Sequence, residues 1–157
     1  MTRERFIAEV RVCQGSLRRF LTSLCSDAAL ADDIAQEALV RAYVSSGRFV
    51  GNFKAWLLRI AYNCFIDNLR RVPQHASIGP ETLAVPDGTA SDAAFRHEQL
   101  QRAIALLPEK ERTAIVLHYF EDLPLKDIAR VMQIPLGTVK YLLSVGRTHL
   151  KEWIRYD

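Results

Sequence analysis

The side chains best suited to chemistry in this chain are polar and basic, and they recur at helical spacing near the C-terminus. Val139, Leu143, Gly146 and Leu150 would lie on one face of a helix. The opposite face would carry groups that can bond to base edges and phosphates, namely Thr138, Lys140, Tyr141, Ser144 and Arg147. The pattern predicts a helix that enters the major groove of DNA, although a plain helical hairpin with a solvated face would show the same spacing.

A shorter helix is predicted immediately before this one. Pro124 would open it, residues 125–132 would form it, and Gln133-Ile134 would make a tight turn. The small residues Ala129 and Gly146 would allow the two helices to cross closely, as a helix-turn-helix requires.

The rest of the chain must position this motif, and its pattern is also helical. Residues 28–44 repeat apolar positions at helical spacing after Ser26 or Asp27 as a candidate N-cap. Further helices are predicted over residues 53–71, 92–107 and 108–120, and the last helix could reach Arg155. No stretch alternates with period two, so we predict an all-α fold.

The charge pattern and the turn residues predict two small helical domains. Residues 1–72 contain 11 Lys/Arg against 7 Asp/Glu, a net charge of +4. Residues 73–93 contain no Lys or Arg and 3 Asp/Glu. Residues 94–157 contain 10 Lys/Arg and 8 Asp/Glu. Proline and glycine punctuate the acidic segment, which predicts a flexible linker at 73–93 between domains at 1–72 and 94–157. The two basic domains suit a polyanionic partner.

Several classes of protein find no support in the sequence. No apolar run is long enough to span a bilayer, and Glu9 and Arg11 interrupt the apolar stretch at the N-terminus, so we expect neither membrane insertion nor a signal peptide. Cysteines at 13, 25 and 64 form no CxxC motif; free thiols in a reducing cytoplasm explain them, and a redox pair is the alternative. Histidines at 75, 97, 118 and 149 show no metal-ligand spacing, so neither a metal nor a nucleic-acid hydrolase is expected.

Two stretches resemble the extracytoplasmic-function (ECF) group of bacterial sigma factors. DAALADDIAQEALVRAY at 27–43, joined to FKAWLLRIAYNCFIDNLRR at 53–71, is similar to conserved regions 2.2 through 2.4 of that family. The segment from Leu106 to Leu150, which includes LPEKERTAIVLHYFEDLPLKDIARVMQIPLGTVK, is similar to region 4. The resemblance implies a non-enzymatic protein that binds core RNA polymerase, reads two promoter elements and opens the downstream one.

The resemblance also implies roles for particular residues in the N-terminal half. The polymerase-binding helix would use Asp32, Asp33, Gln36, Glu37, Leu39 and Arg41. The downstream (−10) element would be read by a loop that receives a flipped base and by the helix after it. These readers would be Phe49, Asn52, Phe53, Tyr62, Asn63, Asp67, Arg70 and Arg71. Unstacked bases bind to aromatic and amide groups of this kind, whereas Trp56 is expected in the core.

In the C-terminal half, the resemblance assigns the upstream (−35) element to the helix described first. Its polar face would meet the bases, while Lys126 and Lys151 would hold backbone phosphates. The sequence departs from the family where two usual arginines are replaced by Leu142 and Val145, and each loss should lower the salt dependence of binding. Leu142 could touch a thymine methyl. Alternatively, Tyr141, Leu142 and Val145 could form an exposed patch that binds protein.

A free-standing helix-turn-helix regulator is the main alternative. It would bind DNA without polymerase, and it leaves the patterns at 32–37 and 53–71 unexplained. The sigma-factor hypothesis implies polymerase and promoter DNA as partners, a cytoplasmic location and an anti-sigma factor that nothing in the sequence identifies. It implies no cofactor and no small-molecule substrate.

Overall fold

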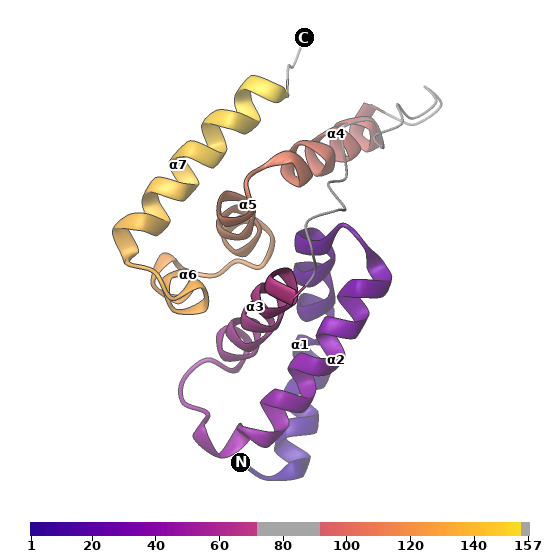
Figure 1. Cartoon of the computed structure of the whole chain (residues 1–157), viewed down its shortest axis with the longest axis vertical. Helices are drawn as coiled ribbons and strands as arrows, with labels where there is room; N and C mark the ends of the chain where they lie inside the picture. Colours follow the sequence, from indigo (N-terminus) through magenta and orange to yellow (C-terminus); the bar gives the residue numbers. More distant parts are fainter. Residues whose placement is uncertain (72–91, 155–157) are drawn as a thin grey trace.

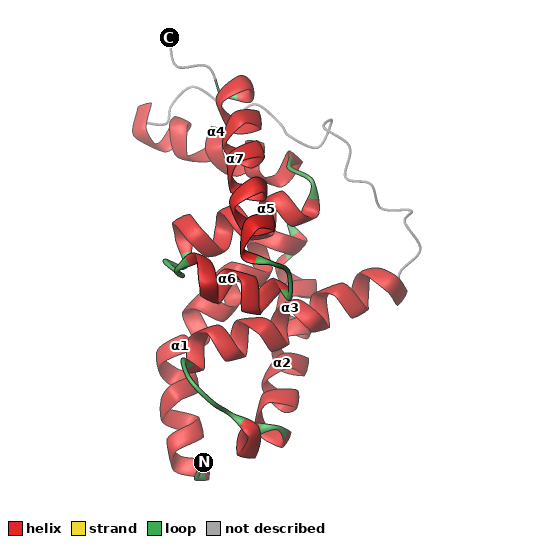
Figure 2. Cartoon of the chain, turned by 90° about the vertical axis from the view of Figure 1, so that its left-hand side faces the viewer, coloured by secondary structure: helices red, strands yellow, loops and turns green. Residues whose placement is uncertain are grey.

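The computed structural model describes residues 1–71 and 92–154. The segment predicted as a linker lies almost wholly outside the described residues, as does Arg155. Throughout the described part the chain is helical, without a strand, which confirms the predicted all-α fold. Figures 1 and 2 show two groups of helices, α1–α3 and α4–α7, packed against each other.

The N-terminal unit comprises α1 (Arg3–Cys25), α2 (Ala28–Val44), the 3₁₀ turn η1 (Ser46–Arg48) and α3 (Phe53–Arg71). The predicted bounds of α2 and α3 are confirmed. Asp27 is the N-cap of α2, because its Oδ1 accepts hydrogen bonds from the backbone N–H groups of Ala29 at 3.0 Å and Leu30 at 3.3 Å. Ser26 instead ends α1 in a left-handed conformation, with φ of 55°.

The core of this unit lies between the three helices. Phe20 and Leu21 of α1 pack with Leu57 of α3, and all three are fully buried. The buried face of α2 consists largely of alanine, at positions 31, 35, 38 and 42. Because alanine side chains are short, α2 can approach both neighbours closely.

The C-terminal unit comprises α4 (Asp92–Leu106), α5 (Glu109–Ile115), the π-helical turn η3 (Val116–Phe120), α6 (Leu125–Met132) and α7 (Leu136–Trp153). The helix predicted over 108–120 therefore changes to π geometry after Ile115. The helix-turn-helix is confirmed: α6 ends at Gln133 with a left-handed φ of 56°, and Pro135 precedes α7. Ile128 and Val139 are fully buried where the two helices meet.

One detail of this motif differs from prediction. A Cβ atom added to Gly146 would lie 3.0 Å from Cγ1 of Ile115, which belongs to α5. The small residue therefore allows α7 to approach α5, rather than its helix-turn-helix partner α6. The prediction was wrong about the partner because helical spacing shows which face is inward but not which helix covers it.

Candidate functional site

The first candidate surface is the outer face of α2. Asp32, Asp33 and Gln36 are exposed there, as the sequence analysis expected of a polar interface. Leu39 is half-buried against the core, so it exposes less of its side chain on this outer face. The structure adds Val40 and Val44, whose exposures of 64% and 78% are unusual for valine in a helix. Their spacing of four from Gln36 places them on the same helical face, although they were not among the predicted contact residues.

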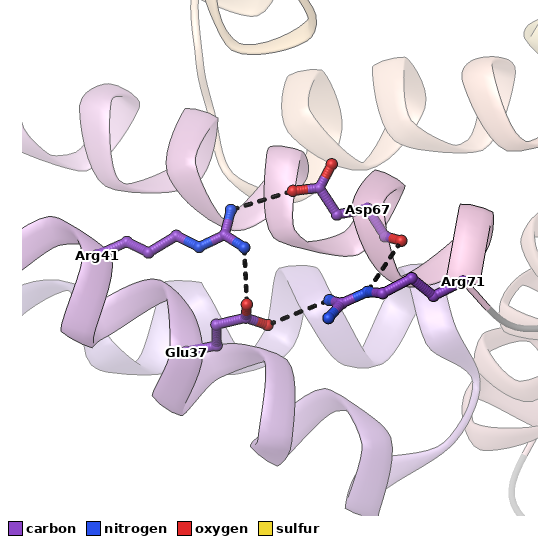
Figure 3. Close-up of polar contacts among 4 residues, drawn as sticks. All are labelled: Glu37, Arg41, Asp67 and Arg71. Carbon is purple, nitrogen blue, oxygen red and sulfur yellow. Dashed lines mark hydrogen bonds and ion pairs between the residues drawn. The ribbon is translucent and has the colours of Figure 1, made fainter.

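Four residues expected to serve two different surfaces contact one another instead (Figure 3). Arg41 of α2 is hydrogen-bonded to Glu37 at 2.7 Å and to Asp67 of α3 at 3.1 Å. Arg71 lies 3.8 Å from Glu37 and donates a 3.4 Å hydrogen bond to the backbone oxygen of Asp67. The hydrogen bond to Asp67 raises the pKa of Arg41. The network joins α2 to α3 and fixes how the two helices present their outer faces.

The loop before α3 is built on an aromatic cluster. The ring of Phe49 lies 5.5 Å from that of Phe53 and 5.4 Å from that of Trp56. Phe53 also contacts Phe6 and is 5% exposed, so it supports the loop from within and offers no face to a base. Phe49 and Trp56 are half-buried. The expectation that Phe53 contacts DNA therefore does not fit its burial.

Asn52 has a different role from its aromatic neighbours. It is exposed, and its Oδ1 accepts a 3.4 Å hydrogen bond from the backbone N–H of Ala55 at the start of α3. Gly51 precedes it with φ of 89°, a conformation that favours glycine. A cleft of about 80 Å³ opens here, lined by Val50, Asn52, Trp56 and Arg59, and on its other side by Asp127 and Arg130 of α6.

The middle of α3 is covered by the C-terminal unit. Tyr62 is 5% exposed, and its hydroxyl donates a 2.8 Å hydrogen bond to Glu109 of α5. Burial, together with the negative charge of Glu109, raises the pKa of Tyr62. Tyr62 therefore cannot contact DNA in this arrangement, contrary to expectation. Asn63 is half-buried, while Arg70 and Arg71 are exposed at the end of the helix.

The polar face of α7 has the expected exposure. Its five candidate residues are all exposed: Thr138, Lys140, Tyr141, Ser144 and Arg147. Lys126 on α6 and Lys151 at the end of α7 are exposed as well. Arg147 donates a 3.0 Å hydrogen bond to the hydroxyl of Tyr119 in η3, a residue for which no role was predicted.

Leu142 lies on the other side of α7. It is 8% exposed and belongs to the hydrophobic core with Leu143. Both expectations for Leu142, contact with a thymine methyl and membership of an exposed apolar patch, were therefore wrong. Val145 is half-buried. Leu142 is thus part of the packing surface of α7.

Comparisons with known proteins match both units. The family model for Sigma-70 region 2 matches residues 10–72, and the model for Sigma-70, region 4 matches residues 97–150. The ECF RNA polymerase sigma factor SigW of Bacillus subtilis is 38% identical over 141 residues, covering 80% of this chain and 75% of the relative. The RNA polymerase sigma-H factor of Pseudomonas aeruginosa is 38% identical over 130 residues, covering 73% of this chain and 67% of the relative.

A solved structure resembles nearly the whole chain. The sigma factor RpoE from Bartonella quintana, in complex with the anti-sigma factor NepR, superposes with a TM-score of 0.81 at 26% identity. The superposition covers 98% of this chain and 99% of that one. Both helical units are therefore placed similarly in the two proteins.

Proposed function

This chain belongs to the sigma-70 family of RNA polymerase sigma factors, in its extracytoplasmic-function group, and directs promoter-specific transcription; from that premise we propose how its surfaces divide the work. The outer face of α2 binds core polymerase, the loop before α3 and the end of α3 read the −10 element, and α7 reads the −35 element. The observation that carries the proposal is the exposed polar face of α7, combined with a separate exposed face on α2 that a simple DNA-binding regulator does not need.

The proposed polymerase contact is centred on Asp33, Gln36, Val40 and Val44, which lie at successive turns of α2. Exposed apolar side chains bordered by carboxylate and amide groups are typical of protein interfaces, because the apolar groups supply burial and the polar groups supply orientation. Glu37 and Arg41 are already paired within the chain. We assign them the supporting role of holding α2 against α3, with Asp32 and Leu39 at the edge of the contact.

The proposed −10 contacts are exposed and half-buried groups of α3 and of the loop before it. Phe49 and Asn52 offer an aromatic ring and an amide to an unstacked base. Asn63 lies on the same helix, and Arg70 and Arg71 supply positive charge for phosphates, with Asp67 as the acceptor that orients Arg71. Phe53 acts as a support for Phe49.

The proposed −35 contacts lie mainly on α7, with Lys126 on α6 beside it. Thr138, Tyr141 and Ser144 carry groups that can contact base edges, and the lysines at 126, 140 and 151 carry charges for the backbone. Leu142 takes no part, since it is in the core.

The related RpoE is bound to an anti-sigma factor. We infer that this chain is also held by an anti-sigma factor until transcription is needed, and that it acts in the cytoplasm. Among the described residues no helix is long and apolar enough to cross a membrane.

Run-off transcription with purified core polymerase tests the proposal. We expect transcripts from a restricted set of promoter fragments, and a complex of chain and core on a sizing column. The double variant Val40→Asp/Val44→Asp should lose the complex, while Val12→Asp, on an exposed position of α1, should keep it. Promoter-independent output, or no complex for the unmodified chain, would sink the proposal. Tight, sequence-specific DNA binding without polymerase would favour the free-standing regulator instead.

A further inference from the structure

The seam between the two helical units contains a buried carboxylate that the proposed promoter and polymerase contacts do not use. The side chain of Glu121, directly after η3, is 0% exposed. Its Oε1 lies 3.4 Å from Arg19 of α1 and 3.8 Å from Lys54 of α3. Lys54 also donates a 2.7 Å hydrogen bond to the backbone oxygen of Glu121. Both cations belong to the N-terminal unit and the carboxylate to the C-terminal unit, so the ion pairs join the units.

The negative charge of Glu121 is only partly balanced by its two cationic partners. Arg19 keeps 65% of its side chain exposed, and Lys54 keeps 29%. Within the described chain, Oε2 of Glu121 is buried without a hydrogen-bond partner. A buried oxygen without a hydrogen-bond partner raises the free energy of the closed chain. If the seam opened, water could donate a hydrogen bond to this oxygen and remove that penalty.

The seam contains further polar contacts, beside apolar packing that continues from one unit into the other. Arg112 of α5 donates a 2.7 Å hydrogen bond to the backbone oxygen of Leu24 at the end of α1. The bond from Tyr62 to Glu109 crosses the same seam. Polar contacts between units of one chain are typical of surfaces that separate reversibly, because water can replace each of them.

The closed seam covers part of the surface that would read the −10 element. Tyr62 lies beneath α5, and the cleft beside Asn52 has α6 as its other wall. Residues of the C-terminal unit therefore cover this part of α3.

We propose that Glu121 is a conditional latch, which lets the chain hold itself closed only while Lys54 and Arg19 balance the buried carboxylate. Removing one partner of a buried ion pair leaves an uncompensated charge and strongly disfavours the buried state. Replacing the charged group by an apolar one of similar volume is often neutral or stabilising. The consequence for promoter reading rests on the proposed function, whereas the closure itself does not.

The first test removes the better-buried cation. Lys54→Met keeps most of the side-chain volume and removes the charge and the hydrogen bond to Glu121. In the isolated full-length chain, we expect a larger radius of gyration by small-angle X-ray scattering. We also expect amide hydrogen exchange across residues 53–62 to become at least about tenfold faster, in line with the cost of an unpaired buried charge. Lys110→Met, an exposed position on α5, is the matched control and should change neither quantity.

The second test changes the carboxylate itself. Glu121→Met should keep the chain closed, and the double variant Lys54→Met/Glu121→Met should reverse the opening caused by Lys54→Met alone. With core polymerase, Glu121→Met should lower promoter-directed transcription, because the closed chain would no longer carry the free-energy cost of the unpartnered Oε2 and would open less readily. Asp122→Asn, at the exposed neighbouring position, should behave like the unmodified chain.

Two results would overturn the latch. One is that Lys54→Met matches Lys110→Met in both scattering and exchange. The other is that Glu121→Met accelerates exchange across residues 53–62. If circular dichroism shows that Lys54→Met has lost helix content, the exchange result for Glu121→Met alone decides whether the latch proposal stands. Because scattering and exchange are measured without polymerase, failure of the chain in transcription would leave these results unaffected.

Discussion

Gly146 of α7 lies directly against Ile115 of α5, so that an added Cβ atom would come within 3.0 Å of Cγ1 and 3.3 Å of Cδ1 of the isoleucine. Ile115 is 1% exposed and is enclosed by the core of the C-terminal unit. It therefore has little room to move aside. This pair sets how closely α7, the proposed DNA-reading helix, can approach the rest of its unit.

The first prediction concerns this contact. Gly146→Ala should lower the free energy of unfolding by about 1 kcal/mol, because crowding against Ile115 outweighs the gain of roughly 1 kcal/mol that alanine usually brings to a helix. Gly137→Ala is the matched control, since nothing lies within 4 Å of its added Cβ atom and it should be neutral or slightly stabilising. Urea denaturation of both variants measures the difference. A stabilised Gly146→Ala would show that the packing there is looser than the structure indicates.

The second prediction separates the two faces of α7. Leu142→Arg places a charge in the core, so we expect a loss of about 3 kcal/mol in stability and no gain in affinity for −35 DNA. Ser144→Arg adds the same charge on the exposed face. It should steepen the dependence of DNA affinity on salt by about one phosphate contact without destabilising the fold. Thermal unfolding and DNA binding at several salt concentrations check both. Tighter DNA binding by a well-folded Leu142→Arg would mean that α7 faces DNA with its other side.

These two positions show what the sequence could and could not predict. Local patterns determined the helix bounds well: Asp27 caps α2, and α3 begins and ends at the predicted residues. The motif of α6 and α7 was also readable, because its inward residues recur at helical spacing. Leu142 was misplaced because a family pattern of charged residues was carried over to a position that packs in the core here.

Contacts between the two units were beyond the reach of the sequence. Tyr62 and Glu109 are 47 positions apart, and no periodicity links them. Glu121 is followed directly by Asp122, and nothing in the sequence shows which of the two acidic side chains is buried between Arg19 and Lys54. Such pairs depend on how whole helices pack, whereas spacing along the chain describes one helix at a time.

The third prediction concerns the network between α2 and α3. Arg41→Gln and Asp67→Asn should each lower stability by about 0.5–1 kcal/mol, and the double variant should lose less than the sum, since both remove the same ion pair. The side chains are 42% and 44% exposed, so water screens the pair and keeps the effect modest. Arg70→Gln, at an exposed position one residue before Arg71, serves as the control. Strictly additive losses in chemical denaturation would show that Arg41 and Asp67 act independently.

The fourth prediction concerns pH and the free thiol of Cys25. Burial, reinforced by the negative charge of Asp27, raises the pKa of Cys25 from 9.0 to about 11. In the unfolded chain the thiol ionises near its ordinary value, so between these two pH values the unfolded state loses a proton that the folded state keeps. Stability from Cys25 is therefore complete below pH 9 and is lost as the pH rises to about 11.

The measurement is the free energy of unfolding as a function of alkaline pH. Between pH 9 and 11 the unmodified chain should lose about 2 kcal/mol more than Cys25→Ala loses over the same range, because a tenfold difference in acidity between the folded and unfolded thiol corresponds to about 1.4 kcal/mol. Cys13 and Cys64 also have pKa values raised by burial, but they are present in both proteins and cancel in the comparison. Parallel curves for the two proteins would show that the thiol of Cys25 ionises as readily in the folded chain as in the unfolded one, and that the end of α1 is more open to water than its packing implies.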